Sequence, residues 1–163
     1  MSSPASIRRI DPRGHRFGGG LSAIFLLIAV AVGAPLLVAA VAAMLAASAF
    51  FGTQYSLLGK PWPVVRRTLR LPPPAELEAE FPPRFAQALG TVGLSAGLLL
   101  LAAGAPVAGW AFVLGVAALQ TVLAVTGYCL GCRLYFLRWF LPVLFDRLVG
   151  PRDVRIAMGG RIR

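Results

Sequence analysis

Two long stretches of the sequence carry no charged side chain, and they constrain the fold more than any other feature. The first runs from Phe17 to Gly52, about 36 residues, and the second from Phe85 to Cys132, about 48 residues. Each is longer than the roughly 18 apolar residues that indicate a membrane span. Charged residues make up 13% of the chain, against about 25% in soluble domains. The sequence therefore predicts a membrane protein that crosses the bilayer several times.

Both stretches are too long for one span, and the same tripeptide interrupts each of them. A single helix of about 36 residues would be about 54 Å long, whereas the hydrocarbon core is about 30 Å thick. Gly-Ala-Pro recurs at 33–35 and 104–106, and in such a turn the glycine ends one helix and the proline begins the next. We therefore expect four spans, arranged as two helical hairpins, near residues 17–33, 35–52, 85–103 and 106–126.

The two halves of this pattern look like a tandem repeat. Arg-Phe opens each half, at 16–17 and at 84–85, and a glycine closes each half, at Gly52 and Gly127. A duplicated hairpin in parallel orientation predicts a pseudo-two-fold axis along the membrane normal. The expected fold class is an all-α membrane protein with four transmembrane helices, as two tandem hairpins, plus interfacial amphipathic segments.

The basic residues predict the orientation. The net charge is +10, and all basic residues except Lys60 are arginines. With four spans they all lie on one side of the membrane, while both Gly-Ala-Pro turns are uncharged. Basic loops stay in the cytoplasm, so we expect both termini and the middle loop to face inward. The arginines flank apolar stretches and form no nucleic-acid recognition motif, so we expect the lipid bilayer and no nucleic acid as partner.

The segments outside the hairpins have features of their own. Residues 61–71 (PWPVVRRTLRL) mix arginines with bulky apolar groups and fit the headgroup region. The acidic cluster 76–80 is interpreted as a solvated helix start or a docking face. We expect, in order, a cytoplasmic arm (1–16), the first hairpin (17–52), a cytoplasmic loop (53–84), the second hairpin (85–128), the CxxC with an interfacial helix (129–149), and a basic tail (150–163).

Small and polar residues within the spans predict how the helices pack. Gly93 and Gly97 form a GxxxG pattern, which lets helix backbones approach closely in lipid. Gln120 lies well inside the fourth span and is expected to bond to another helix. The spans contain no ionisable residue, which argues against secondary transport of a charged solute.

The chain has two cysteines, Cys129 and Cys132, in CxxC spacing at the cytoplasmic end of the fourth span. Thiols stay reduced there, which argues against a static structural disulfide. Three interpretations remain: packing of two small apolar side chains, a zinc site to which His15 adds a ligand, and redox or sulfur-relay chemistry. Residues three apart share a helix face, so closing a reversible disulfide needs a modest adjustment.

The reactivity of the pair depends on which end of a helix it occupies. If the fourth span ends at Gly127 and a new helix begins near Cys129, the exposed N–H groups and Arg133 favour the thiolate. If the span continues to Leu130, the negative end of its dipole disfavours the thiolate. Gly127 favours the first arrangement, with Cys129 as the nucleophile and Cys132 as the resolving thiol.

Three segments resemble the domain of unknown function 4395 family of bacterial integral membrane proteins: IDPRGHRF (10–17), PPAELEAEFPPRFAQALG (73–90) and VTGYCLGCRLYF (125–136). The positions that match the family pattern are Asp11, Arg13, Pro83, Arg84, Phe85, Gly127, Cys129, Gly131 and Cys132. The family has no agreed activity. Its members are often encoded near thioredoxin-like proteins and thiosulfate sulfurtransferases, so the resemblance implies a partnership in thiol or sulfur chemistry.

These features predict a protein of the bacterial cytoplasmic (inner) membrane whose CxxC exchanges electrons or sulfane sulfur with a soluble thioredoxin-like or sulfurtransferase-like partner. It would be an anchor and relay rather than a self-sufficient enzyme, with no metal and no cofactor. One alternative is a non-catalytic subunit of a larger membrane complex. Another is a passive conduit for a small neutral or sulfur-containing solute.

Overall fold

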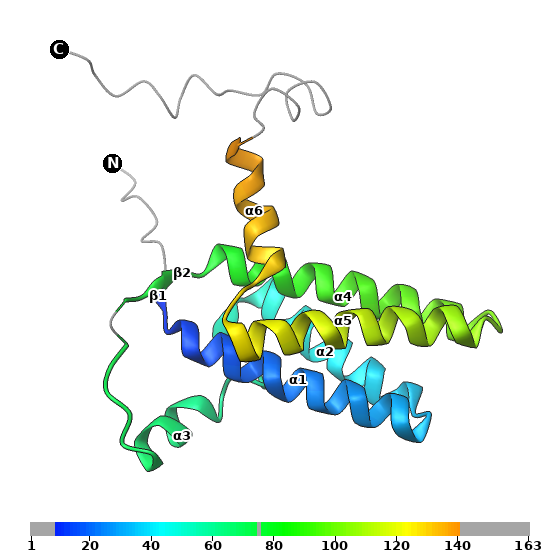
Figure 1. Cartoon of the computed structure of the whole chain (residues 1–163), viewed down its shortest axis with the longest axis horizontal. Helices are drawn as coiled ribbons and strands as arrows, with labels where there is room; N and C mark the ends of the chain where they lie inside the picture. Colours follow the sequence, from blue (N-terminus) through cyan, green and yellow to red (C-terminus); the bar gives the residue numbers. More distant parts are fainter. Residues whose placement is uncertain (1–8, 75, 141–163) are drawn as a thin grey trace.

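A computed structural model describes residues 9–74 and 76–140 of the chain, and the surroundings of the side chains as far as Tyr135. This part is mostly helical, with one short antiparallel pair of strands (Figure 1). The elements in chain order are β1 (Arg9–Ile10), α1 (Pro12–Val32), α2 (Pro35–Phe51), the 3-10 turn η1 (Thr53–Tyr55), α3 (Trp62–Thr68), β2 (Glu78–Ala79), α4 (Phe81–Ala102), α5 (Pro106–Thr126) and α6 (Leu130–Phe140).

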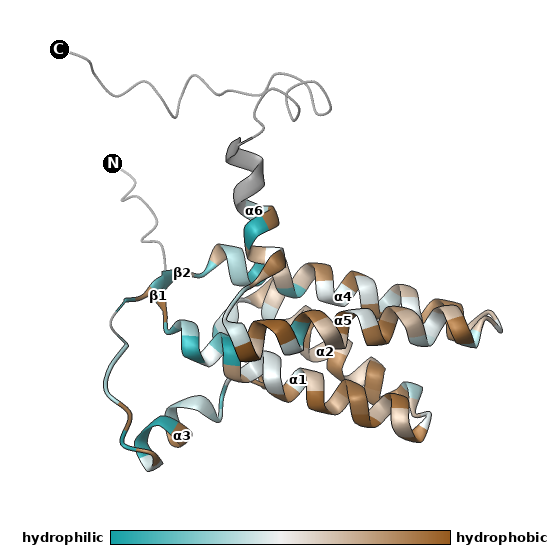
Figure 2. Ribbon diagram, in the orientation of Figure 1, coloured by the Kyte–Doolittle hydropathy of each residue, from teal (hydrophilic) through white to brown (hydrophobic). Residues whose placement is uncertain are grey.

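Three of these helices, α1, α4 and α5, are long and apolar enough to cross a membrane. The apolar helix α2 is shorter, at 17 residues. Hydrophobic residues cover the helices along most of the bundle (Figure 2). Large apolar side chains such as Leu36 and Val107 are almost fully exposed on its surface, which suits a surface that faces lipid. The chain is therefore an all-α, multi-pass membrane protein.

The four apolar helices form one bundle in which the two halves of the chain interlock. The closest associations are α1 with α5 and α2 with α4, and the pairs α4–α5 and α1–α2 complete the ring. Each helix contributes a fully buried side chain to a shared core: Leu26, Val38, Leu94 and Val113. Lipid is as apolar as these side chains, so close packing holds the helices together more than removal from water does.

Glycines in the left-handed conformation end the helices that lead into the two tight turns. Gly33, with φ of 64°, follows α1, and Gly104, with φ of 79°, lies between α4 and α5. Glycine adopts this conformation without the clash that a Cβ brings. Both turns lie at the same end of the bundle, remote from β1, α3 and α6 (Figure 1).

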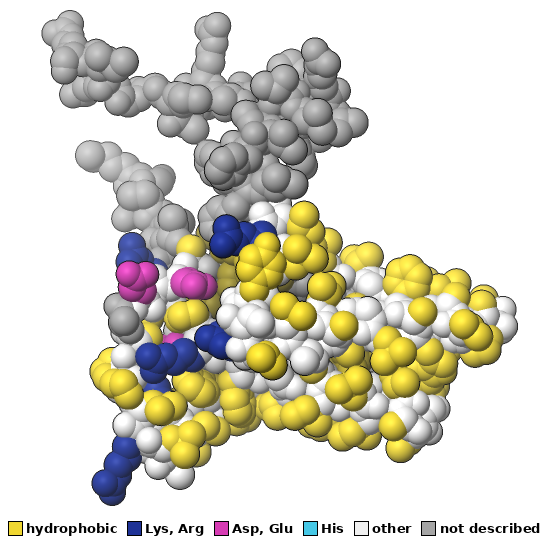
Figure 3. Space-filling view, in the orientation of Figure 1, with side chains coloured by type: hydrophobic (Ala, Val, Ile, Leu, Met, Phe, Trp, Pro, Cys, Tyr) yellow, Lys and Arg dark blue, Asp and Glu magenta, His cyan; other side chains and the backbone are white. Residues whose placement is uncertain are grey.

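On the face that Figure 3 shows, the charged side chains of the described residues lie at the opposite end of the bundle, where Figure 1 places the short elements. There β1 pairs with β2, with Arg9 opposite Ala79, which joins the N-terminal segment to the middle loop. Helix α6 packs against α4 and runs crosswise to the bundle (Figure 1). The N-terminal segment, the middle loop and the CxxC segment therefore meet at one end.

The structure differs from the sequence-based expectations in two respects, the starts of two helices and the exposure of the acidic cluster. Helices α1 and α4 begin at Pro12 and Phe81, about one turn before the expected spans, so His15, Arg16 and Arg84 belong to helices. The acidic cluster is not solvated throughout: Glu80 is buried, and its Oε1 accepts hydrogen bonds from the backbone N–H and the hydroxyl of residue 53. The N-terminal residues 1–8, residues 141–149 of the expected interfacial helix and the basic tail 150–163 lie outside the described residues.

Candidate functional site

The CxxC lies where α5 gives way to α6. Gly127 ends α5 with φ of 74°, and Cys129 directly precedes Leu130, the first residue of α6. The backbone N–H of Cys132 donates to Cys129 Sγ at 3.1 Å, and that of Arg133 donates to the carbonyl of Cys129 at 3.0 Å. Cys129 therefore caps the N-terminus of α6, where backbone N–H groups have no partner within the helix.

Cys129 and Cys132 are joined as a disulfide, with their Cα atoms 5.2 Å apart. This separation lies within the usual range of about 4.4–6.8 Å. In the dithiol form, the Cys132 N–H and the positive end of the α6 dipole would both favour a thiolate at Cys129. The local backbone thus accommodates the oxidised pair and offers the reduced pair an activated sulfur.

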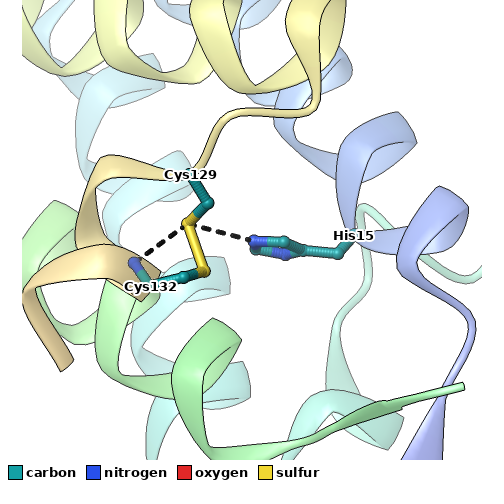
Figure 4. Close-up of side chains that lie close together, drawn as sticks. All are labelled: His15, Cys129 and Cys132. Carbon is teal, nitrogen blue, oxygen red and sulfur yellow. Dashed lines mark hydrogen bonds between the residues drawn. A yellow bond between two sulfur atoms is a disulfide. The ribbon is translucent and has the colours of Figure 1, made fainter. Parts of the chain in front are cut away.

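His15, in the first turn of α1, points at this pair from 114 residues away in the chain (Figure 4). Its Nε2 lies 4.0 Å from Cys129 Sγ. In one tautomer Nε2 can accept the proton of the Cys129 thiol, and in the other its N–H can donate to the thiolate. The sequence had pointed to His15 as a possible metal ligand only, because no local pattern links it to the cysteines.

The same three side chains form a potential metal-ligand group. A ring nitrogen of His15 and the two sulfurs lie within 4.8 Å of one another. A closed zinc site needs four ligands, so this group is one ligand short. In the disulfide state the sulfurs are bonded to each other, and metal binding would require the dithiol form.

Two contacts hold α6 against α4. A Cβ placed on Gly131 would lie 2.8 Å from the Cα of Ala86, so the first turn of α6 touches the α4 backbone. The rings of Phe85 and Tyr135 meet with centroids 5.8 Å apart. Phe85 and Gly131, both singled out in the sequence, therefore set the position of the helix that carries the cysteines.

Two arginines tie the halves of the chain together in equivalent ways. Arg16 in α1 donates to two carbonyls near the end of α5, at 3.1 and 3.4 Å. Arg84 in α4 donates to two carbonyls near the end of α2, at 2.9 and 3.0 Å. Gly127 leaves room for the first contact, because a Cβ there would lie 3.1 Å from the Arg16 guanidinium carbon. Positively charged groups are favourable at helix C-termini.

Asp11 joins the start of α1 to the middle loop. Its carboxylate accepts hydrogen bonds from the Arg13 backbone N–H at 2.9 Å and from the Trp62 indole N–H at 3.0 Å. It also pairs with Arg66 at 3.6 Å. The Arg13 side chain donates to a carbonyl of the loop after α3 at 3.1 Å. Asp11 and Arg13 therefore fix the helical turn that carries His15.

An open cleft of about 940 Å³ leads to the disulfide. Both cysteines and His15 line it, and its charged lining residues are Arg13, Arg16, Glu76, Glu78 and Arg133. Arg133, expected to stabilise the thiolate, places its guanidinium over the ring of Tyr128, 5.5 Å from the ring centre. The backbone N–H of Arg133 donates to the Cys129 carbonyl. The cleft presents both signs of charge to an approaching molecule.

The three residues expected to pack helices lie deeper in the bundle. A Cβ on Gly93 would lie 2.9 Å from Val116 Cγ2, and one on Gly97 would lie 3.0 Å from a carbonyl of α5. Both glycines therefore face α5 within this chain. Gln120 faces α1, with its Oε1 3.0 Å from the position of a Cβ on Gly19. The buried Gln87, which the sequence did not single out, lies near His15 and lines the same cavities.

Comparison with known proteins yields one match. A family model described as a domain of unknown function (DUF4395) matches residues 10–139. No curated protein and no solved structure matches the chain. The matched range contains His15, both cysteines and the arginine and glycine contacts that position them, and the description of the family names no activity.

Proposed function

We propose that this chain, which belongs to the DUF4395 family over residues 10–139, carries out membrane-bound thiol–disulfide exchange with a soluble partner. The observation that carries the proposal is the Cys129–Cys132 disulfide at the N-terminus of α6, lining an open, charged cleft. A disulfide that only stabilises a fold needs no access from outside, whereas exchange requires attack by another thiolate. The partner is a thioredoxin-like or sulfurtransferase-like protein.

The exchange proceeds in two balanced steps. A partner thiolate attacks Cys129 Sγ, the bond to Cys132 breaks, and Cys132 leaves as a thiolate that takes up a proton. The second thiol of the partner then attacks the partner sulfur of the mixed disulfide, and Cys129 leaves. The Cys132 N–H and His15 stabilise the departing Cys129 thiolate. Two electrons and two protons have then passed from the partner dithiol to the CxxC pair.

A sulfurtransferase-like partner would use the same sulfur in the dithiol form. The Cys129 thiolate attacks the outer sulfur of the partner persulfide, and the partner leaves as a thiolate. The product is a persulfide on Cys129, and one sulfane sulfur has moved without any change in the number of thiolates. The chain is in either case an anchor and relay, and it depends on its partner for turnover.

The proposal also includes the number of membrane spans and the side of the membrane that the cleft faces. The 17 residues of α2 measure about 26 Å, close to the roughly 30 Å of the hydrocarbon core, so we take α1, α2, α4 and α5 as four spans in two hairpins. The cleft end carries the basic residues (Figure 3), and basic loops stay in the cytoplasm. Both termini and the cleft then face the cytoplasm of a bacterial inner membrane.

Single cysteines introduced into a chain that lacks its own two test this orientation. We expect an impermeant thiol reagent added to intact cells to label Ala34→Cys and Ala105→Cys in the two turns. We expect it to leave Lys60→Cys unlabelled until the membrane is permeabilised. Labelling of position 60 from outside would overturn the orientation.

Trapping tests the exchange chemistry and the division of labour between the cysteines. We expect Cys132→Ser to accumulate a mixed disulfide with a thioredoxin that lacks its resolving cysteine and whose remaining cysteine is activated with thionitrobenzoate, because the Cys129 thiolate displaces thionitrobenzoate from that sulfur. We expect Cys129→Ser to accumulate none. In the Cys132→Ser chain, Cys129 should be alkylated at pH 7 about tenfold faster than a free thiol. This follows because a thiol of pKa about 8.5 is only about 3% thiolate at that pH.

The opposite trapping pattern would make Cys132 the nucleophile. If neither variant traps the thioredoxin and Cys129 reacts no faster than a free thiol, the exchange function is wrong. A non-catalytic subunit of a larger membrane complex would then be the better description of the chain.

A further inference from the structure

A second cavity, which the exchange reaction does not use, also reaches Cys129. Its volume is about 120 Å³, and α1, α4, α5 and α6 all contribute to its wall. Cys129 and His15 line both this cavity and the charged cleft. The apolar part of the wall is formed mainly by Leu89, Val116, Leu119, Leu123, Leu130 and Leu134. The reactive sulfur is therefore shared by a charged cleft and an apolar cavity.

The apolar cavity is bordered by side chains that face the lipid. Leu89 on α4, Leu119 on α5 and Leu134 on α6 are 41%, 50% and 45% exposed. Leu119 lies seven residues before the end of α5, about 10 Å along the helix, within the apolar part of the bundle. A molecule that enters between these leucines comes from the bilayer rather than from water.

Gln87, which lines this cavity and a smaller one that shares His15 and Gln120 with it, carries a buried hydrogen-bond acceptor. Gln87 is 7% exposed, and its Oε1 has no hydrogen bond among the described residues. Buried polar groups are almost always satisfied, and an unpaired one calls for an explanation. Gln120 and His15 are the other polar side chains in the lining. A ligand that donates a hydrogen bond from an otherwise apolar ring would satisfy Gln87.

We propose that this cavity binds the ring of a membrane quinone, and that the chain passes electrons from a soluble dithiol to that quinone. The inference rests on the proposed exchange function and names its electron acceptor. A quinone dissolves in the bilayer and accepts two electrons, the number that a dithiol releases on forming a disulfide. Its reduced form carries hydroxyl groups that can donate to Gln87. The cavity, at about 120 Å³, is smaller than the apolar cavity of about 150 Å³ that binds benzene, so it would take part of the ring, and the remaining substituents and the tail would lie between the bordering leucines.

The reaction balances as follows. The Cys129 and Cys132 sulfurs together lose two electrons, and the bond between them forms. The quinone gains these electrons, and its two carbonyl oxygens become hydroxyls by taking up two protons. One proton comes from Cys132 and the other, originally on Cys129, passes through His15. A soluble dithiol then reduces the disulfide through the cleft, so the net reaction converts that dithiol and a quinone into a disulfide and a hydroquinone.

The test uses the purified, reduced protein in lipid nanodiscs without oxygen, with decylubiquinone as the probe. We expect one equivalent of hydroquinone per chain, measured by absorbance, together with the loss of both alkylatable thiols. Leu119→Trp should fill the cavity and slow quinone reduction at least tenfold. Leu114→Trp is the matched control, because Leu114 is 43% exposed on the same helix and lies outside the cavity lining, and it should leave the rate unchanged.

A second variant tests the role of the Gln87 side chain as a hydrogen-bond acceptor. Gln87→Leu should slow quinone reduction severalfold, because it removes the acceptor for the hydroxyl that forms on the ring and keeps the approximate volume of the side chain. Exchange with a soluble dithiol, measured on the same samples, should be unchanged in both Gln87→Leu and Leu119→Trp. This second readout also shows that each variant is folded.

Quinone reduction that is equally fast in Leu119→Trp and in the unaltered chain would overturn the proposal, because the reaction would then occur outside the cavity. The proposal would also be overturned if the chain exchanges with the soluble dithiol and never reduces the quinone. That result would not contradict the exchange function. Loss of both activities in the unaltered chain would contradict the exchange function as well.

Discussion

Replacing Gly131 with alanine tests how closely α6 has to pack on α4 for the site to exist. The added Cβ would lie 2.7 Å from the Cβ and 2.8 Å from the Cα of Ala86. Carbon atoms in ordinary contact are about 3.5–4.0 Å apart, so α6 must move by about 1 Å. No side-chain rotation can relieve the clash, because one of the two atoms belongs to the backbone.

The expected change in the free energy of unfolding follows from two opposing effects. Overpacking of this kind costs about 1–3 kcal/mol, while replacing a helical glycine with alanine gains about 1 kcal/mol. We expect a net loss of up to about 2 kcal/mol in the free energy of unfolding. The shift also moves Cys129 relative to His15, whose Nε2 lies 4.0 Å from its sulfur. Alkylation of Cys129, measured in the Cys132→Ser background, should therefore slow toward the rate of a free thiol.

Gly115→Ala is the matched control, because a Cβ on Gly115 in α5 has no atom within 4 Å. It should stabilise the chain by about 0.5–1 kcal/mol and leave alkylation unchanged. Denaturant unfolding in detergent and the alkylation rate of both variants are the measurements. The packing described for α6 is refuted if Gly131→Ala behaves like Gly115→Ala in both.

Two further variants test the contacts that support the site. Arg84→Gln removes charge-assisted hydrogen bonds to two carbonyls of α2, and we expect unfolding in detergent to become easier by about 1–3 kcal/mol; an effect no larger than that of Arg67→Gln, on the exposed side of α3, would contradict this. Asp11→Ala removes the cap of α1 and the acceptor of the Trp62 indole, with an expected loss of about 1–2 kcal/mol and a change in tryptophan fluorescence. Asp11→Asn keeps a capping oxygen and should lose less, so equal losses in the two would exclude capping as the cause.

Local chemistry was enough to predict where the helices end. Gly33, Gly104 and Gly127 all adopt positive φ at or next to the end of a helix. In lipid each helix must satisfy its own backbone hydrogen bonds, so the places where a helix stops depend on the residues at that point of the chain. The position of Cys129 at the start of α6 follows from the same local rule, because Gly127 separates it from α5.

The sequence was less informative about the faces by which the helices meet. An amphipathic helix reveals its buried face by its apolar stripe, but a helix that is apolar all round does not. The place of Arg133 next to Cys132 in the chain likewise did not reveal that its side chain would lie over the ring of Tyr128.

The sequence by itself therefore determined a helical membrane protein with a cysteine pair at the start of a helix, because charge, helix breaks and CxxC spacing act locally. Only the tertiary structure decided that α1 lies against α5, and with it that His15 faces Cys129 and Arg16 reaches the end of α5. It also decided that α4 and α6 enclose an apolar cavity beside the same sulfur. These contacts join residues that are distant in the chain, and they depend on the shapes of packed surfaces, which a uniformly apolar sequence does not encode in its pattern.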